Sequence, residues 1–399
     1  MAAILEQQKN LYLDEHGTPM NAVQEKQNFD IMVSLQGLYF CDAESISHFG
    51  SDAKYWETIS DGLHCTSDVE DFSKRLEALR QKDASLKTAG GEKLTETGRL
   101  IENQGFAVVD NSNMTEARKL VLRRIWNTVK NLEQEGWPAA FIFLFDEFWM
   151  FHVEPMFDIY GALLDDNDCL MEPDLNCWSL RPTPMATGRY VGEESSNYIG
   201  RNFGKSHRDM KYNMCHDADT EKFNSLNAWV PMNPSGASHL NGAMRVIPIE
   251  YDDFHYDSNH LYHMNTKKAL GFMEKGVLEK EATKILEAGV GALCTWVPSL
   301  IHWGGACGNA SMLEKGNTEP RMSFAATFRK SIAPRSQYGV DGSETEDLEK
   351  GPPPIGRKDL NFLDIGRRLS YVAKAIISFA HWYPGFPGLD INRLEKGCR

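Results

Sequence analysis

The chain has 399 residues, 42% of them hydrophobic, which is enough to bury a large core in one main domain with extensions. Its formal net charge of −14 and its lack of a dense Lys/Arg run argue against nucleic acid or an anionic membrane as a partner. The longest apolar run, at 139–153, is interrupted by Asp146 and Glu147, too short to span a membrane, and no secretory signal is visible.

The eight cysteines are spread irregularly and include no C-x-x-C pair. In a long chain this usage indicates free thiols in a reducing compartment. We therefore expect a cytoplasmic protein.

The N-terminal quarter of the chain has a helical pattern. Over residues 24–90, apolar side chains recur at three- and four-residue intervals, as in Phe72, Leu76 and Leu79. We expect residues 1–93 to form a helical N-terminal extension.

A further helix is predicted to begin near Asn113, because Asn113 and Glu116 are similar to a capping box. An apolar stripe follows, made of Val121, Ile125, Val129 and Leu132. We expect this stripe to pack on the outside of a sheet.

From about 140 to 330 the sequence reads as short strands separated by Gly, Pro, Asn and Ser clusters. The strand-like segments are WSLRP, GRYVG, LNAWVPM, MRVIPI, ALCTWV and MSFAATF. This pattern predicts a sandwich or barrel with flanking helices, an α+β chain that is mainly β. At 336–399 a Pro-rich turn, GPPPIGRKD, precedes helical RRLSYVAKAIISFAHW. We expect this C-terminal extension to pack on the core or on a neighbouring subunit of an oligomer.

Three residues form a candidate metal site: His207, Asp209 and His302, the last lying 95 positions (302 minus 207) after the first. Side chains at i and i+2 of a strand project from one face, so His207 and Asp209 can reach the same ion. The second histidine must come from another strand, and residues 292–303, which are rich in β-formers, are expected to form it. Two imidazoles and a carboxylate are the ligand set that holds Fe(II) on one face and leaves positions open.

The segment EPRMSFAATFRK predicts a period-two strand with Arg321 and Ser323 on its more polar face. A planar guanidinium beside a hydroxyl suits bidentate binding of a carboxylate. A dicarboxylate co-substrate is therefore chemically plausible.

Residues 94–330 resemble the phytanoyl-CoA dioxygenase family of Fe(II)/2-oxoglutarate-dependent oxygenases. The resemblance rests on LIENQGFAVVDNSNMTEARKLVLRRI, on the His-x-Asp at 207–209, on NAWVPMNPSGASHLNGAMRVIP at 227–248, and on the closing order of Gly291, His302, Asn309 and Arg321. Two departures are a long gap of 19 residues from His302 to Arg321 (321 minus 302) and IEYDDFHYDSNH after Pro248.

The resemblance implies a double-stranded β-helix, or jelly roll, over residues 94–335. It also implies that His207, Asp209 and His302 bind iron, that Arg321 binds the far carboxylate of 2-oxoglutarate, and that Ser323 assists. The implied reaction uses O2, turns 2-oxoglutarate into succinate and CO2, and oxidises an unactivated C–H bond of a small molecule. The aspartate at 209 favours hydroxylation over halogenation; desaturation, ring closure and demethylation stay open.

Two other classes remain open on the sequence alone. A β-barrel hydrolase or isomerase would use the same metal ligands without 2-oxoglutarate, and a binding protein would keep only the fold. The histidines at 255, 260 and 263 could form a zinc site, although a loop lining the substrate entrance or a plain surface loop fits better. Two acidic, aromatic-rich stretches, at 145–161 and 249–263, would suit a compact polar or cationic substrate.

Overall fold

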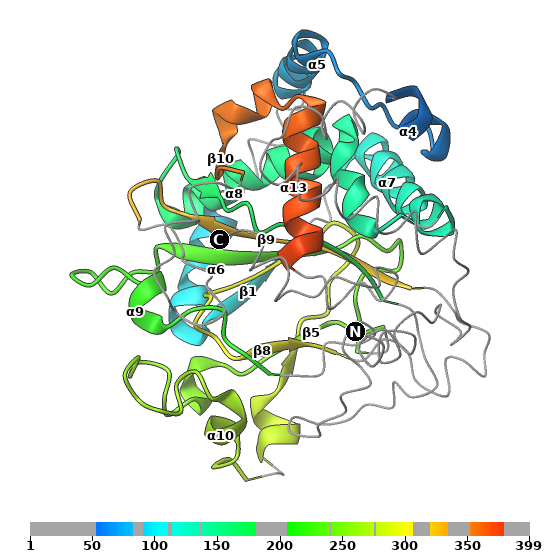
Figure 1. Cartoon of the computed structure of the whole chain (residues 1–399). Coiled ribbons are helices and arrows are strands. Elements are labelled where there is room, and N and C mark those ends of the chain that lie inside the picture. Colours follow the sequence, from blue (N-terminus) through cyan, green and yellow to red (C-terminus); the bar gives the residue numbers. More distant parts are fainter. Residues whose placement is uncertain are drawn as a thin grey trace, which may run out of the picture.

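The computed structural model describes residues 53–82, 91–110, 114–135, 137–180, 206–239, 241–274, 277–305, 320–333 and 352–378. Two antiparallel sheets lie at its centre, with helices above the larger sheet and α10 below the smaller one (Figure 1). The helices are α4 (Ala53–Ile59), α5 (Val69–Lys82), α6 (Gly91–Gln104), α7 (Glu116–Gln134), α8 (Glu154–Leu164), α9 (Tyr212–Cys215), α10 (Thr266–Leu270) and α13 (Ile365–Ser378). Shorter turns of helix are η2 (Ala139–Leu144), η3 (Phe148–Val153), η5 (Ile249–Tyr251), η6 (Leu278–Ala282) and η8 (Arg357–Phe362). Within the described ranges, no helix combines the length and the hydropathy needed to cross a membrane.

The larger sheet has seven strands and is built around β9. Its order is β1 (Phe106–Val109), β7 (Leu293–Trp296), β4 (Ser225–Pro231), β9 (Arg321–Arg329), β2 (Leu170–Met171) and β10 (Ile355–Gly356), and β3 (Asn176–Leu180) also pairs with β9. The smaller sheet has the order β6 (Lys284–Ile285), β5 (Met244–Val246) and β8 (His302–Gly304). The predicted strand that begins at Arg321 is confirmed, and its register places Asn176 and Trp229 on either side of Ala325.

The expected α+β combination of sheets with flanking helices is confirmed, and the sheets are antiparallel. The expectation of a mainly β chain was wrong, because more of the described residues lie in helices than in strands. The described strands form two separate sheets and no closed barrel, so the jelly roll stays a prediction. The division of the chain at residues 93 and 335 also stays a prediction. The segment GRYVG at 188–192, predicted as a strand, lies outside the described residues.

Two predictions of local structure were wrong. Residues 292–303 are not one strand: β7 ends at Trp296 and β8 begins at His302 in the other sheet, with a turn between them in which Pro298 has no N–H to donate to a ladder. Residues 139–164 form η2, η3 and α8 rather than strands. That run is apolar on all sides, and its periodicity does not separate a buried helix from a buried strand.

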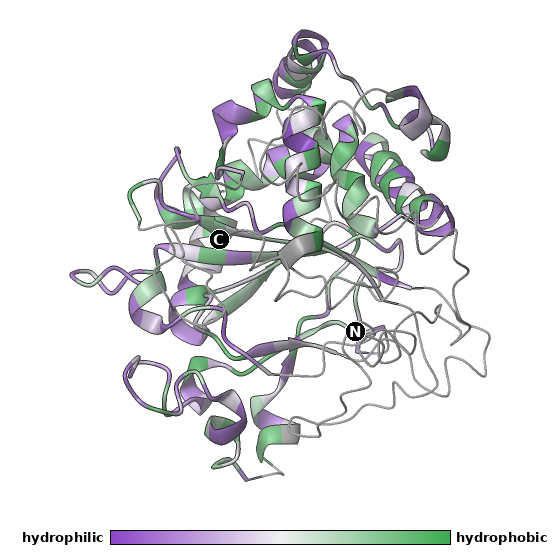
Figure 2. Cartoon of the chain, in the orientation of Figure 1, coloured by the Kyte–Doolittle hydropathy of each residue, from purple (hydrophilic) through white to green (hydrophobic). Residues whose placement is uncertain are grey.

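Helix α7 carries its predicted apolar stripe, with Ile125, Val129 and Leu132 almost fully buried. Figure 2 colours this helix both green and purple along its length, as expected for an element with one apolar side. Its N-cap is Thr115, whose hydroxyl accepts a hydrogen bond from the Arg118 N–H at 3.3 Å, and not the predicted Asn113, which lies outside the described residues.

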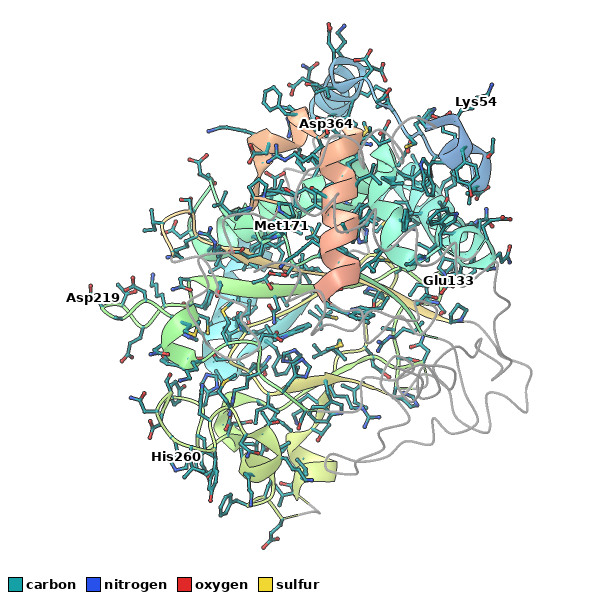
Figure 3. The ribbon with its side chains drawn as sticks, viewed as in Figure 1. Lys54, Glu133, Met171, Asp219, His260 and Asp364 are labelled. Carbon is teal, nitrogen blue, oxygen red and sulfur yellow. The ribbon has the colours of Figure 1, made fainter. Side chains whose placement is uncertain are left out.

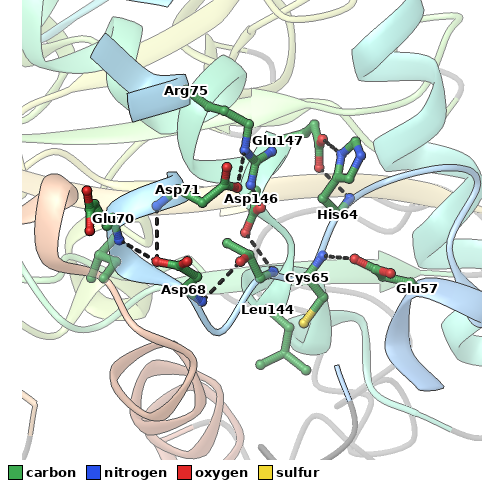
Figure 4. A network of polar contacts seen from close by, with 12 residues as sticks. Glu57, His64, Cys65, Asp68, Glu70, Asp71, Arg75, Leu144, Asp146 and Glu147 are labelled. Atoms are coloured by element: carbon green, nitrogen blue, oxygen red, sulfur yellow. Dashed lines mark hydrogen bonds and ion pairs between the residues drawn. The ribbon is translucent and has the colours of Figure 1, made fainter. Parts of the chain in front are cut away.

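The N-terminal helices are tied to the rest of the molecule by a polar network around Asp146 (Figure 4). The Asp146 carboxylate is fully buried and forms ion pairs with Arg75 of α5 and Arg368 of α13. The Asp146 N–H donates to the His64 carbonyl, and the neighbouring Glu147 accepts from the His64 N–H at 2.8 Å. A buried charge needs an opposite charge or a hydrogen bond, and the partners of Asp146 come from distant parts of the sequence. The network therefore holds these segments together.

Candidate metal centre

The two histidines of the candidate site face each other across a short antiparallel bridge. The His207 N–H donates to the His302 carbonyl and the His302 N–H donates to the His207 carbonyl, each at 3.0 Å. Directly opposed residues in such a pair project to the same face. Their rings accordingly lie 4.3 Å apart between centroids. The prediction that the second histidine comes from a separate strand lying alongside is confirmed.

Asp209 completes the group. Its N–H donates to the Pro298 carbonyl at 2.9 Å, which fixes the backbone two residues after His207. Its carboxylate oxygens lie 3.5 Å from Nε2 of His207 and 3.3 Å from Nε2 of His302. One ligand atom from each of the three residues lies within 4.8 Å of the others. Among the described residues, this trio is the cluster of His, Cys, Asp or Glu side chains able to hold a metal ion.

His302 is set up as a neutral nitrogen ligand. Burial lowers the pKa of its imidazole to about 4, so the ring is uncharged at neutral pH. Its Nδ1 lies 2.9 Å from the Leu300 carbonyl, and donation of the Nδ1 proton there leaves the Nε2 lone pair facing Asp209. The Trp296 ring packs 5.0 Å from the His302 ring and shields it from water.

A hydrogen-bonded chain from the larger sheet orients the Asp209 carboxylate. The Asn227 side-chain NH2 donates to Asp209 at 2.5 Å, and the Thr327 hydroxyl donates to the Asn227 side-chain oxygen at 2.8 Å. Asn227 and Thr327 are directly paired in β4 and β9. The larger sheet therefore positions a ligand that the short segment at 206–209 supplies.

The segment that carries the ligands is held from behind by Arg208. This side chain is fully buried and donates to the carbonyls of His263 and Ser299, each at 2.6 Å. It also forms an ion pair with Asp252 at 2.7 Å, and the Asp252 side chain is only 1% exposed. No local sequence pattern indicates this role, because the partners of Arg208 lie between 44 and 91 residues away.

His207, Asp209 and His302 line a cavity of about 330 Å³ that lies between the two sheets. Arg321 lines the same cavity, is 1% exposed, and donates from Nη1 to the Gly242 carbonyl. Ser323 lies on the same strand face but does not line the cavity; its fully buried hydroxyl has no hydrogen-bond partner among the described residues. Further lining residues, which the sequence analysis missed, are Asp174, Asn176, Trp178 and Lys374.

The other candidate histidines do not form a zinc site. His263 uses both ring nitrogens, with Nδ1 2.7 Å from the Phe254 carbonyl and Nε2 accepting from the Tyr212 N–H at 3.1 Å. His255 is fully buried, whereas His260 lies at the outer edge of the molecule, as does Asp219 (Figure 3). Neither acidic, aromatic-rich stretch lines the cavity, so the reason given for a cationic substrate was wrong.

No family model matches the sequence, and no curated protein matches it. Among solved structures, the chain is similar to the non-heme alpha ketoglutarate dependent carbocyclase SnoK from nogalamycin biosynthesis, at 13% identity and a TM-score of 0.40, over 65% of this chain and 90% of that one. The epimerase SnoN in complex with Fe3+, alpha ketoglutarate and nogalamycin RO gives 12% identity and a TM-score of 0.39, over 66% and 96%. EctD from S. alaskensis gives 14% identity and a TM-score of 0.37, over 61% and 80%. Likeness at this level assigns neither a family nor a function to the chain.

Proposed function

We propose that this protein is an Fe(II)/2-oxoglutarate-dependent oxygenase, similar to the phytanoyl-CoA dioxygenases, that oxidises and most simply hydroxylates a small molecule. The observation that carries the proposal is the convergence of His207, Asp209 and His302 at a cavity that Arg321 also lines. The donor set fits Fe(II), because it offers two imidazole nitrogens and one carboxylate from one side. We assign the same fold as that family's jelly roll to residues 94–335.

When bound, iron with 2-oxoglutarate and O2 supplies oxidation of an unactivated C–H bond, coupled to conversion of 2-oxoglutarate to succinate and CO2. The protein itself holds and orients the metal ligands and the co-substrate. Asn227 and Thr327 fix the Asp209 carboxylate, and the Leu300 carbonyl fixes the His302 tautomer. Arg321 is the buried cation for the far carboxylate of 2-oxoglutarate, and small residues further along β9, Ala325 and Ala326, leave room in the cavity. Ser323 is proposed to assist from the same strand face.

The test is an anaerobic titration of the metal-free protein with Fe(II) and then 2-oxoglutarate, followed by the visible charge-transfer band of a chelated keto acid. We expect a band in the wild type and none in His207→Ala. The control is His239→Ala, an exposed histidine that pairs with Glu287 and lies outside the cavity lining, and this variant keeps the band.

Arg321→Met separates the co-substrate from the metal. Because a hydrogen bond to a charged group contributes roughly 1.5–3 kcal/mol, we expect half-saturation by 2-oxoglutarate to rise roughly 10- to 150-fold while Fe(II) still binds. If the wild-type protein binds the metal tightly but shows no charge-transfer band at any 2-oxoglutarate concentration, the result would instead indicate a hydrolase or isomerase. Failure to bind Fe(II) at all would indicate a binding protein.

A further inference from the structure

One side of the cavity carries polar groups that iron and 2-oxoglutarate do not use. Asp174 precedes β3, Lys374 lies on the C-terminal helix α13, and the two form an ion pair at 3.1 Å. Their side chains are only 18% and 14% exposed, and both line the cavity. Helix α13 reaches the sheet with its C-terminal end (Figure 1). The ion pair is therefore part of the cavity wall and not a surface contact.

This side of the cavity lies away from Arg321. Asn176 pairs with Ala325, four positions along β9 from Arg321 (325 minus 321), which corresponds to about 13 Å of strand. Trp229 pairs with Ala325 on the other side, and its ring lies 5.9 Å from the Arg321 guanidinium, so it belongs to the Arg321 side of the cavity. A ligand can therefore occupy the Asp174 side while a dicarboxylate contacts Arg321.

Two further side chains in the cavity indicate that it receives a polar ligand. Asn176 is 6% exposed and its side-chain oxygen has no hydrogen-bond partner among the described residues. The Trp296 Nε1–H, on a side chain 3% exposed, likewise has none in the described part of the chain. A buried polar atom left without a partner costs about 1–3 kcal/mol, so a bound ligand that supplies one donor and one acceptor is favoured.

The charges of the cavity cancel. Its lining holds two carboxylates, Asp174 and Asp209, and two cations, Arg321 and Lys374. Fe(II) and the 2-oxoglutarate dianion carry equal and opposite formal charge, so the loaded site stays balanced. A substrate with a large net charge, such as an acyl-CoA thioester with its phosphates, would upset this balance in a partly desolvated space. A neutral or zwitterionic substrate does not.

We propose that Asp174 and Lys374 form the recognition site for a small zwitterionic substrate, an amino acid in its broad chemical sense. Its ammonium group binds Asp174, its carboxylate binds Lys374, and its carbon skeleton extends toward the Asn227–Thr327 pair, where Asn227 contacts the metal-ligand candidate Asp209. Oxidation of this carbon skeleton depends on the proposed oxygenase function, whereas binding of the zwitterion does not. The cavity of about 330 Å³ is at the small end for ligand sites, which suits a compact molecule.

The test measures binding, not turnover. The twenty standard L-amino acids are titrated singly into the protein loaded anaerobically with Fe(II) and 2-oxoglutarate, and in parallel into the protein alone, by calorimetry and by the shift of the charge-transfer band. For any amino acid that binds, its N-acetyl and carboxamide derivatives are compared. We expect each derivative to bind roughly tenfold or more weakly, because each lacks one charge-assisted contact.

Two variants test which charged group of the ligand contacts Asp174 and which contacts Lys374. Asp174→Asn should lose the discrimination against the N-acetyl derivative, and Lys374→Met should lose the discrimination against the carboxamide, while Lys374→Arg keeps it. The matched control is Lys358→Met, which breaks a pair with Asp168 of the same 3.1 Å length but 88% and 72% exposed. Each variant is first shown to unfold in one cooperative transition above the temperature of the binding assay, and a lowered melting temperature is expected for Asp174→Asn and Lys374→Met because each leaves one buried charge without its partner.

The outcomes separate this proposal from the proposed function. A charge-transfer band with no amino acid binding, or with palmitoyl-CoA binding instead, overturns the zwitterion site and leaves the oxygenase in place. Amino acids that bind Asp174→Asn and Lys374→Met as tightly as the wild type also overturn it. Calorimetric binding with the reciprocal pattern but without any band supports the recognition site while the oxygenase proposal fails.

Discussion

Asp252→Asn tests how far the ligand segment depends on the buried partner of Arg208. The substitution keeps the shape of the side chain and leaves the Arg208 guanidinium charged, fully buried and without its ion pair. Removing one partner of a buried pair costs about 3–5 kcal/mol, because the remaining charge stays desolvated. We expect the free energy of unfolding, measured by urea at pH 7, to fall by that amount, and Fe(II) affinity to fall with it because Arg208 lies between His207 and Asp209.

The pH dependence of the same variant checks the cause. Burial tends to raise the pKa of Asp252, but the neighbouring His255 and Arg208 side chains outweigh it and lower the pKa from 3.8 to about 2. A depressed carboxyl pKa stabilises the fold above about pH 4, and this contribution is lost as the pH falls toward 2. At about 1.4 kcal/mol per pKa unit, it amounts to about 2 kcal/mol.

The measurement compares urea unfolding of the wild type and Asp252→Asn from pH 7 down to pH 2. The difference between the two should narrow by about 2 kcal/mol below pH 4, whereas the exposed control Asp219→Asn should match the wild type throughout. A loss below 1 kcal/mol at pH 7, or a difference that does not change with pH, would refute the reasoning that Asp252 stabilises the fold as an ionised partner of Arg208.

Three further changes have defined outcomes. Asn227→Ala should lower Fe(II) affinity roughly 10- to 100-fold in a chelator competition, because Asp209 loses its orienting donor; unchanged affinity would exclude that role. Gly105→Ala should lower the melting temperature, at a cost of about 1–3 kcal/mol, since φ is +88° and a Cβ there would lie 2.5 Å from Leu300 Cδ1; an unchanged melting temperature would show that the turn relaxes. Glu154→Gln should cost about 3 kcal/mol in urea unfolding, as this buried carboxylate pairs with two arginines, and a loss under 1 kcal/mol would contradict the assignment.

The metal-type trio could be found from the sequence because part of it is local. His207 and Asp209 are two residues apart, and the period of a strand predicts that their side chains lie together. The side chains do converge, although His207 forms only an isolated β-bridge and Asp209 lies in a bend. His302 needed a second strand, and the β-formers around it indicated one. The strand at Arg321 was visible for the same reason, since its alternation is a local pattern.

The rest depends on contacts that leave no local trace. Asp174 and Lys374 are 200 residues apart (374 minus 174), and neither stands in a recognisable motif. The end of β7 at Trp296 could not be separated from the start of β8, because the turn between them is itself apolar and buried. The helices at 139–164 were missed since an all-apolar run fits either period.

Strand β9 is made late in synthesis and yet occupies the middle of the larger sheet (Figure 1). Its partners β2, β3 and β4 leave the ribosome earlier and present unpaired edges until Arg321–Arg329 is available to join them. Sheets that wait for distant segments fold slowly, and exposed edges can pair with other chains in the meantime. Production of this protein is therefore expected to depend on slow expression at low temperature or on chaperones that cover those edges.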